Sequence, residues 1–254
     1  MNMRWQWWHR PQTPFTAPVP WVDFHCHIVP GVDDGPRTLD EAVRMLEHAA
    51  RIGITHLVTT PHYSDQYAPE ENDVARGLAA LRGRLSGAAA ALQIIVGREI
   101  SLTDQHVRSV QHHAHLRIGG GTLALVELPE GLNRAAILEG CSALLLAGIR
   151  PVVAHPERNF MVQNTPELAA ELRLRGAAVQ VNAASFAGAY GAAAQRTAWH
   201  LLHQQCVDVL SSDAHRASDY ATYVKVCQTV MRDAGTVQIK EMISTVPARL
   251  LQLS

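Results

Sequence analysis

Residues 22–35 read VDFHCHIVPGVDDG, and this strand and loop are the starting point for the fold. His25 and His27 lie two positions apart, so both side chains point to the same side of a β-strand. Two imidazoles on one face suit a metal ion. Asp33 and Asp34 follow in a loop bounded by proline and glycine. The alternate residues of the strand are expected on the opposite face, backed by helices: Phe24, Cys26 and Ile28.

Outward from this stretch, short runs rich in β-branched residues alternate with longer helix-forming runs. This alternation is typical of βα units and a largely parallel sheet. Seven strands are predicted, at residues 22–28, 56–60, 93–97, 123–128, 151–155, 178–182 and 207–211. Helices are predicted near residues 39–51, 73–85, 134–147, 166–175, 192–205 and 220–233. The first helix carries signals at both ends, because Thr38 and Glu41 have capping-box spacing and Gly53 sits at the expected C-cap.

Polar side chains follow almost every predicted strand at its carboxyl end. In chain order they are His62, Glu99, Glu127, His155 with Arg158, Asn182 with Ser185, and Asp213 with His215. An open doubly wound sheet gathers ligand groups between two or three strands, whereas a barrel brings groups from all its strand ends to one mouth. The sequence therefore favours a seven-stranded α/β barrel, (β/α)7, over an open sheet.

Five histidines and four carboxylates in one mouth need positive charge, because clustered carboxylates repel one another and otherwise take up protons. Divalent metal ions supply that charge. A mixed histidine and carboxylate set suits zinc, manganese or iron, and the absence of cysteine ligands argues against a structural zinc site. Nine ligands exceed the needs of one ion, so two or three ions are expected, and such clusters hydrolyse phosphate esters.

Six other histidines are expected to be solvated surface groups. His112, His113 and His115 form a dense local cluster, but they lie away from any predicted strand end. Two more lie on a predicted helix and one in the N-terminal segment: His200, His203 and His9.

The composition is that of a soluble globular protein. The 254 residues are 47% hydrophobic with a net charge of −1, which gives no electrostatic reason to expect nucleic acid or an anionic membrane as a partner. No segment is predicted to insert into a membrane. The four cysteines are scattered without a CxxC pair, so a reducing cytoplasm is expected. The oligomeric state is left open, a homo-oligomer included.

Residues 21–254 are expected to form one domain, because no linker or low-complexity run divides them. Residues 1–20 hold three tryptophans and four prolines and are predicted to be an irregular arm. The alternative for this arm is a docking motif formed by Trp5, Trp7 and Trp8.

Six motifs in this order carry a resemblance to a known family: DFHCHIVPGVDDG, TPHY, GREI, VELP, AHPERN and SDAH. They resemble the polymerase and histidinol phosphatase (PHP) superfamily. Within it they are most similar to the bacterial manganese-dependent tyrosine-protein phosphatases of capsular and exopolysaccharide synthesis. The resemblance extends over residues 22–215.

The resemblance implies a distorted seven-stranded, TIM-like barrel with three metal ions, manganese foremost. It also implies that the substrate is a phosphotyrosine-bearing tyrosine kinase that controls polysaccharide synthesis. Asp34, and not Asp33, is the implied ligand in the first loop, a choice that spacing alone leaves open. The implied ligands are His25, His27, Asp34, His62, Glu99, Glu127, His155, Asp213 and His215.

Arg158 is the candidate catalytic residue outside the ligand set, because it follows His155 by three positions and a guanidinium can bind phosphate oxygens in a bidentate manner. Its alternative role is a salt bridge within the loop. No general acid is assigned, because a tyrosine phenolate, whose conjugate acid has a pKa of about 10, leaves without much help.

Three other functions compete with the tyrosine phosphatase. A small-molecule phosphatase of the histidinol-phosphate type would use the same scaffold and the same ligands. A non-catalytic regulatory module is disfavoured because the ligand set is intact. A cysteine-dependent phosphatase is excluded because no cysteine lies in a phosphate-binding loop followed by arginine.

Overall fold

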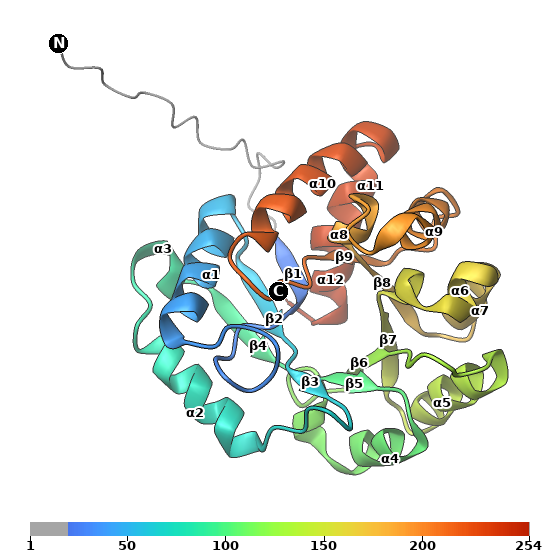
Figure 1. The fold of residues 1–254 in the computed structure, drawn as a ribbon, viewed down its shortest axis with the longest axis horizontal. Coiled ribbons are helices and arrows are strands. Elements are labelled where there is room, and N and C mark those ends of the chain that lie inside the picture. The colour runs from blue at the N-terminus through green and yellow to red at the C-terminus, as the bar shows by residue number, and fades with distance from the viewer. Residues whose placement is uncertain (1–19, 254) are drawn as a thin grey trace.

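The computed structural model describes residues 20–253 of the chain, drawn as a ribbon in Figure 1. The expectations for the arm at residues 1–20, with its tryptophans and His9, therefore lie outside the described residues, apart from Pro20.

All strand pairs between the named strands are parallel. One sheet has the order β1-β2-β4, and the other has the order β3-β5-β6-β7-β8-β9. The prediction of an α/β fold built on parallel strands is therefore confirmed. The strands are β1 (Val22–Cys26), β2 (His56–Thr59), β3 (His62–Tyr63), β4 (Gln93–Val96), β5 (Glu99–Ser101), β6 (Leu123–Glu127), β7 (Arg150–Ala154), β8 (Ala178–Asn182) and β9 (Val209–Ser211).

The closed seven-stranded barrel is not observed in residues 20–253, which form nine strands in two sheets. The predicted strands at residues 56–60 and 93–97 are observed as β2 and β4, and each is followed by a short strand that was not predicted: β3 after Thr60 and Pro61, and β5 after Gly97 and Arg98. Proline has no N–H to donate to a sheet. At Gly97 a Cβ atom would lie 3.0 Å from the Ile118 side chain, so only glycine lets that segment pass.

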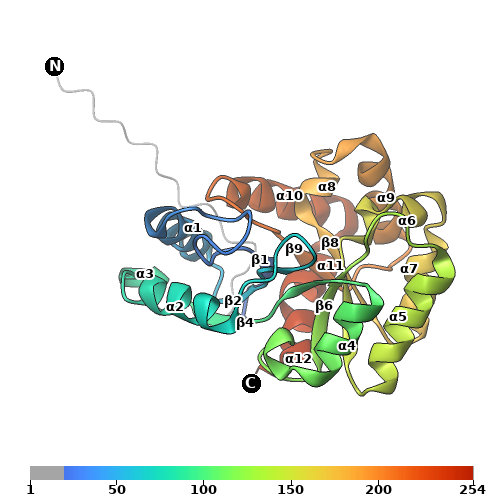
Figure 2. The same cartoon turned by 60° about the horizontal axis from the view of Figure 1, so that its bottom comes forward.

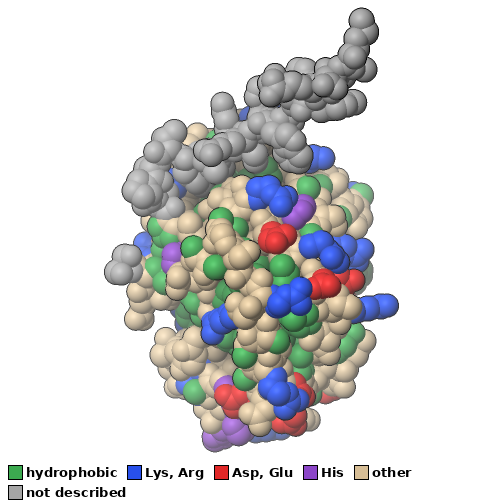
Figure 3. All heavy atoms as spheres, turned by 90° about the vertical axis from the view of Figure 1, so that its left-hand side faces the viewer, with side chains coloured by type: hydrophobic (Ala, Val, Ile, Leu, Met, Phe, Trp, Pro, Cys, Tyr) green, Lys and Arg blue, Asp and Glu red, His purple; other side chains and the backbone are tan. Residues whose placement is uncertain are grey.

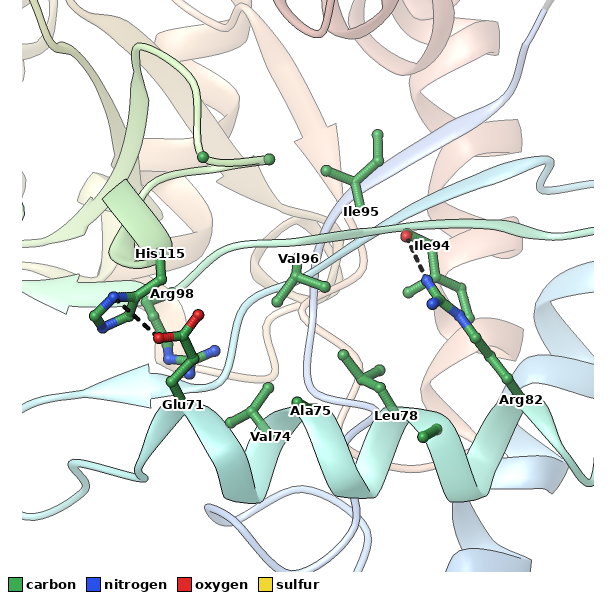
Figure 4. A pocket seen from close by; sticks show the side chains of 13 residues that line it. Glu71, Val74, Ala75, Leu78, Arg82, Ile94, Ile95, Val96, Arg98 and His115 are labelled. Carbon is green, nitrogen blue, oxygen red and sulfur yellow. Dashed lines mark hydrogen bonds and ion pairs between the residues drawn. The ribbon is translucent and has the colours of Figure 1, made fainter. Parts of the chain in front are cut away.

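The two sheets meet on one side and stay apart on the other. At the meeting side an isolated bridge joins Cys26 to Ala214, and the His27 N–H donates to the Ala214 carbonyl at 2.9 Å. On the other side residues 118–121 pass between β4 and β6, and the Gly119 N–H donates to the Val96 carbonyl at 2.7 Å. Figure 4 shows the resulting apolar cavity, of about 520 Å³, between helix α2 and Ile94, Ile95 and Val96.

Helices surround the strands and follow most of the predicted ranges (Figure 1). The C-terminal helices after residue 235 were not predicted, and a π-helical turn, η3 (Glu241–Thr245), joins two of them. The α-helices are α1 (Leu39–Ile52), α2 (Glu71–Arg82), α3 (Gly87–Ala90), α4 (Asp104–His112), α5 (Arg134–Leu146), α6 (Phe160–Asn164), α7 (Glu167–Leu174), α8 (Ala183–Phe186), α9 (Gly191–His203), α10 (Asp219–Ala234), α11 (Thr236–Lys240) and α12 (Val246–Leu250).

Helix α1 begins and ends as predicted. The Thr38 hydroxyl accepts from the Glu41 N–H, and the Glu41 carboxylate accepts from the Thr38 N–H at 3.1 Å, which completes the capping box. Gly53 ends the helix in the left-handed conformation, with φ of 99°. This fixes the loop before α1, which carries Asp33 and Asp34 beside the strand ends.

The apolar core closes the end of the strands opposite to the predicted site. Val246 and Leu250 of α12 pack against a cluster that contains Phe24, Leu125 and Val152. Figure 2 shows α12 and the C-terminus at the lower edge of the molecule. The carboxyl ends of the strands are thus left to the polar groups.

The prediction that Phe24 shares a face with Cys26 and Ile28 is wrong. Phe24 packs in the cluster beside α12, whereas Cys26 and Ile28 pack in a different cluster with Met45 and Leu46 of α1. The register of β1 against β2 shifts between Asp23 and Cys26. Such an irregularity reverses the alternation of side chains along a strand.

The surface formed by α1, α2 and α3 mixes basic, acidic and apolar side chains (Figure 3). Within residues 20–253, no helix combines the length and the apolar character that a membrane crossing requires.

Candidate metal centre

The nine predicted ligands converge at the carboxyl ends of the strands. Each contributes one nitrogen or oxygen atom to at least one group whose atoms all lie within 4.8 Å of one another. The groups overlap, so neighbouring ions would share ligands. They are His27, Asp34, His62 and His215; His25, Glu99 and His155; His25, His27 and Asp213; and His62, Glu99 and Glu127.

Glu99, at the start of β5, lies at the centre of these groups. Its Oε2 atom is 3.2 Å from His25 Nε2, 3.3 Å from His27 Nε2 and 3.0 Å from His62 Nδ1. Its Oε1 atom is 2.7 Å from His155 Nε2. Ligand atoms bound to one ion at about 2.1 Å are separated by about 3.0–3.4 Å, so this spacing fits a shared ion.

Two buried carboxylate oxygens at this centre lack a hydrogen-bond partner within the described part of the chain. They are Glu99 Oε2 and Asp213 Oδ1. Burying an unpaired carboxylate oxygen is costly unless a cation neutralises it. The orphaned oxygens and the imidazole nitrogens around them therefore fit divalent metal ions.

The outer group is more open to solvent. Asp34 is about half exposed, and its Oδ1 atom lies 3.2 Å from His215 Nε2 and 3.4 Å from His62 Nε2. The hydrogen bonds to His215 and His62 hold the pKa of Asp34 well below its usual range. An ion at this group would be the one nearest to an incoming substrate.

Asp33 and Asp34 have different positions although they are adjacent in sequence. Asp33 Oδ2 lies 2.7 Å from His27 Nδ1 and accepts the His62 N–H, and Asp33 Oδ1 accepts the Gly35 N–H. Asp33 thus orients the His27 ring from behind, the position of a residue that supports a ligand. The structure brings Asp34, and not Asp33, into a ligand group.

A buried amide network orients His25 and Asp213. Gln180 Oε1 lies 3.0 Å from His25 Nδ1, and Gln180 Nε2 donates to Asn182 Oδ1. Asn182 Nδ2 donates to Asp213 Oδ2 at 2.6 Å. The sequence prediction named Asn182 as a strand-end group and missed Gln180. The signal for Gln180 was a polar residue at an alternate position of an otherwise apolar strand.

The carboxylates of the centre act on the pKa of two buried imidazoles, those of His25 and His27. Burial acts to lower the pKa of His25, but the Glu99 and Asp213 carboxylates raise it to about 9. Burial also acts to lower the pKa of His27, and the nearby carboxylates of Asp213, Asp33 and Glu99 raise it well above its usual range. The carboxylates therefore demand nearby positive charge, which either protons or metal ions satisfy.

Two ligand residues adopt backbone conformations that are rare for residues with a side chain. His155 has φ of 30° and Asp213 has φ of 50°. Non-glycine residues with positive φ cost energy and are concentrated at functional sites. The fold holds these two side chains against local backbone preference.

A cavity of about 340 Å³ opens onto the ligand groups, and Arg158 lines it. Arg158 Nη1 lies 3.2 Å from Asp213 Oδ2, so its ion pair is with a candidate ligand after another strand and not within its own loop, where the alternative prediction placed it. Tyr190 and Arg216 also line the cavity and were missed by the sequence prediction. Tyr190 lies in a loop between helices α8 and α9, where no strand end or motif marks it. Burial raises the pKa of its hydroxyl to about 12, so Tyr190 keeps its proton.

The other histidines within residues 20–253 stay out of the ligand groups. His112, His113, His200 and His203 are exposed, as predicted. His115 is exposed too and lies 3.5 Å from Glu71, beside the apolar cavity of Figure 4. All four cysteines are buried and free, and Cys26 is part of the core.

The parallel strands and the converging imidazole and carboxylate groups define an α/β protein with a candidate metal centre. The family model for capsular polysaccharide synthesis, CpsB/CapC, matches residues 21–252, and the chain belongs to this family. The resemblance inferred from the motifs is thereby confirmed.

Individual relatives agree with this assignment. The chain is 30% identical over 195 residues to the putative tyrosine-protein phosphatase CapC of Staphylococcus aureus, a match that covers 76% of each chain. It is 29% identical over 232 residues to the tyrosine-protein phosphatase YwqE of Bacillus subtilis (strain 168), covering 91% of this chain and 89% of YwqE.

Solved structures show the same relationship. A crystal structure from a study of YwqE from Bacillus subtilis and CpsB from Streptococcus pneumoniae, described as unique metal-dependent tyrosine phosphatases, superposes with a TM-score of 0.81 and 26% identity. The match covers 92% of this chain and 95% of that chain. The phosphotriesterase homology protein from Escherichia coli, with a TM-score of 0.57 and 14% identity, shares the fold alone.

Proposed function

We propose that this protein is a metal-dependent protein-tyrosine phosphatase that hydrolyses phosphotyrosine on a partner tyrosine kinase and thereby regulates capsular or exopolysaccharide synthesis. The observation that carries the proposal is the convergence of nine metal-capable side chains in overlapping groups beside Arg158. The names of the CapC and YwqE relatives support the phosphotyrosine substrate.

All nine residues act as ligands in this proposal, and the cofactor is manganese, with two or three ions bound. Zinc and iron suit the same histidine and carboxylate donors, so the donors alone do not select manganese. The choice of manganese rests on the family resemblance. Divalent ions at these side chains would supply the charge neutralisation and water activation that phosphate-ester hydrolysis requires.

Arg158 binds the phosphoryl group in the cavity that opens onto the ligand groups. Asp213 contacts its Nη1 atom, and Tyr190 packs against the face of its guanidinium. These two contacts leave its other N–H groups available for phosphate oxygens, which a planar guanidinium binds well. The tyrosine phenolate leaves without an assigned general acid because the conjugate acid has a pKa of about 10.

We also propose that residues 21–254 form one domain, a distorted barrel that is opened between β4 and β6, and that the protein is located in the cytoplasm. The four free cysteines support a cytoplasmic location, because thiols stay reduced there.

Substrate specificity is tested by comparing kcat/KM for a phosphotyrosine peptide and for histidinol phosphate in the presence of manganese. We expect the peptide to be preferred, and His155→Ala and Asp213→Ala to lose activity on both. A preference for histidinol phosphate by orders of magnitude would replace the protein substrate with a small molecule. Exposed Arg108→Gln, which lies outside the ligand groups and does not line the cavity, serves as the control variant.

A further inference from the structure

A second cavity adjoins the metal centre and shares a wall with it. This cavity, of about 470 Å³, lies between the loop before α1 and the turn before α10. Asp34, His215 and Arg216 line both this cavity and the one that opens onto the ligand groups. A peptide whose phosphotyrosine enters the metal centre can therefore place a flanking residue over the second cavity.

Three exposed arginines line the second cavity: Arg37, Arg44 and Arg216. We call this cavity, with these residues, the arginine cleft. Within residues 20–253 none of the three forms an ion pair with a carboxylate within 4.0 Å, although other exposed arginines, such as Arg76 and Arg84, do. The cleft thus presents three guanidinium groups without an ion pair in the described residues, beside the Asp34 and Glu41 carboxylates that also line it.

The nearby carboxylates are occupied by the backbone. Glu41 accepts the N–H groups of Arg37 and Thr38, at 2.8 and 3.1 Å. Asp219 accepts the N–H groups of His215 and Arg216, both at 3.0 Å. These bonds fix the backbone of Arg37 and Arg216 while leaving both side chains free to bind an external anion.

We propose that the arginine cleft binds anionic side chains next to the phosphotyrosine in the substrate peptide. This inference rests on the proposed function. Arginine forms bidentate hydrogen bonds with both carboxylate and phosphate, so an acidic residue and a second phosphotyrosine share the required chemistry. An extended peptide places alternate side chains about 7 Å apart on one side, which lets one anion occupy the cleft while the phosphotyrosine occupies the metal centre.

The experiment compares kcat/KM of the wild type and of Arg37→Gln/Arg44→Gln for three phosphotyrosine peptides. One peptide has neutral flanking residues, one has flanking aspartates, and one has a second phosphotyrosine. We expect the wild type to prefer both anionic peptides. The double variant should lower their kcat/KM relative to the neutral peptide by about tenfold, through KM, at roughly threefold for each exposed arginine. The preference should also weaken as salt is raised.

Arg108→Gln is the matched control, because it removes one exposed arginine outside the cleft and should keep the wild-type preference. The two anionic peptides distinguish carboxylate from phosphate as the bound group. A wild type that hydrolyses the neutral peptide without preferring either anionic one would overturn the cleft and leave the phosphatase assignment standing. Failure to hydrolyse any phosphotyrosine peptide would contradict the proposed function itself.

Discussion

The guanidinium carbon of Arg158 lies 4.3 Å from the centre of the Tyr190 ring. A cation over an aromatic face is attracted by the electrons of the ring, and the contact restricts the arginine to few orientations. Asp213 holds the same guanidinium through its Nη1 atom. Tyr190 is therefore a positioning residue that keeps Arg158 turned toward the cavity.

Replacing Tyr190 with leucine should lower kcat/KM for a phosphotyrosine peptide by about three- to tenfold, because the arginine loses its aromatic support. Tyr190→Phe keeps the ring and should stay within about twofold of the wild type. The readout is the ratio of the two variants in steady-state kinetics. Equal losses in both variants would mean that the hydroxyl, and not the ring, matters.

Asp33 should control metal affinity without being a ligand. Asp33→Asn weakens the contact with His27 Nδ1, and loss of such a supporting carboxylate typically costs about 10- to 100-fold in metal affinity. The dissociation constant for manganese is measured by competition with a chelating dye. An unchanged constant would show that the loop alone orients His27.

Glu157 should stabilise the fold near the site. Its buried Oε1 atom accepts the Asn182 N–H at 3.0 Å and the Ser185 hydroxyl at 2.6 Å. Glu157→Ala leaves both donors without that acceptor, and the free energy of unfolding should fall by about 2–4 kcal/mol. Glu157→Gln retains a carbonyl acceptor and should lose less. Urea denaturation compares the two, and equal losses would argue against the hydrogen bonds as the cause.

Metal ions should stabilise the whole domain, because they neutralise the carboxylates and the orphaned oxygens of Glu99 and Asp213. A ligand at 100 times its dissociation constant contributes about 2.7 kcal/mol, so manganese should raise Tm of the chelator-treated protein by about 5 °C or more. Differential scanning calorimetry measures the shift. The Asp213→Ala variant should show a much smaller one.

Much of the fold could be predicted because buried parallel strands appear as apolar runs between helical repeats. The breaks at Pro61, between β2 and β3, and at Gly97, between β4 and β5, were harder to predict. The turn at residues 118–121, which separates β4 from β6, is distant from both breaks in sequence. The faces of β1 were mispredicted for a similar reason, because the register shift after Asp23 depends on pairing with β2.

The nine candidate ligands were predictable because they lie in or just after the predicted strands, towards the carboxyl ends where parallel strands meet. Gln180 and Tyr190 were not, because their roles depend on neighbours from other elements: His25 for Gln180 and Arg158 for Tyr190. The roles of Arg37 and Arg216 could not be predicted either. These two arginines line one cleft because the segments before α1 and α10 lie next to each other beside the metal centre.

The most direct measurement is phosphate release from a phosphotyrosine peptide by one preparation of the protein, before chelation, after chelation and after manganese is restored. Activity should disappear with the ions and return with manganese, and it should be absent throughout in His155→Ala. Equal rates before and after complete removal of the ions would contradict the metal centre as the site of catalysis.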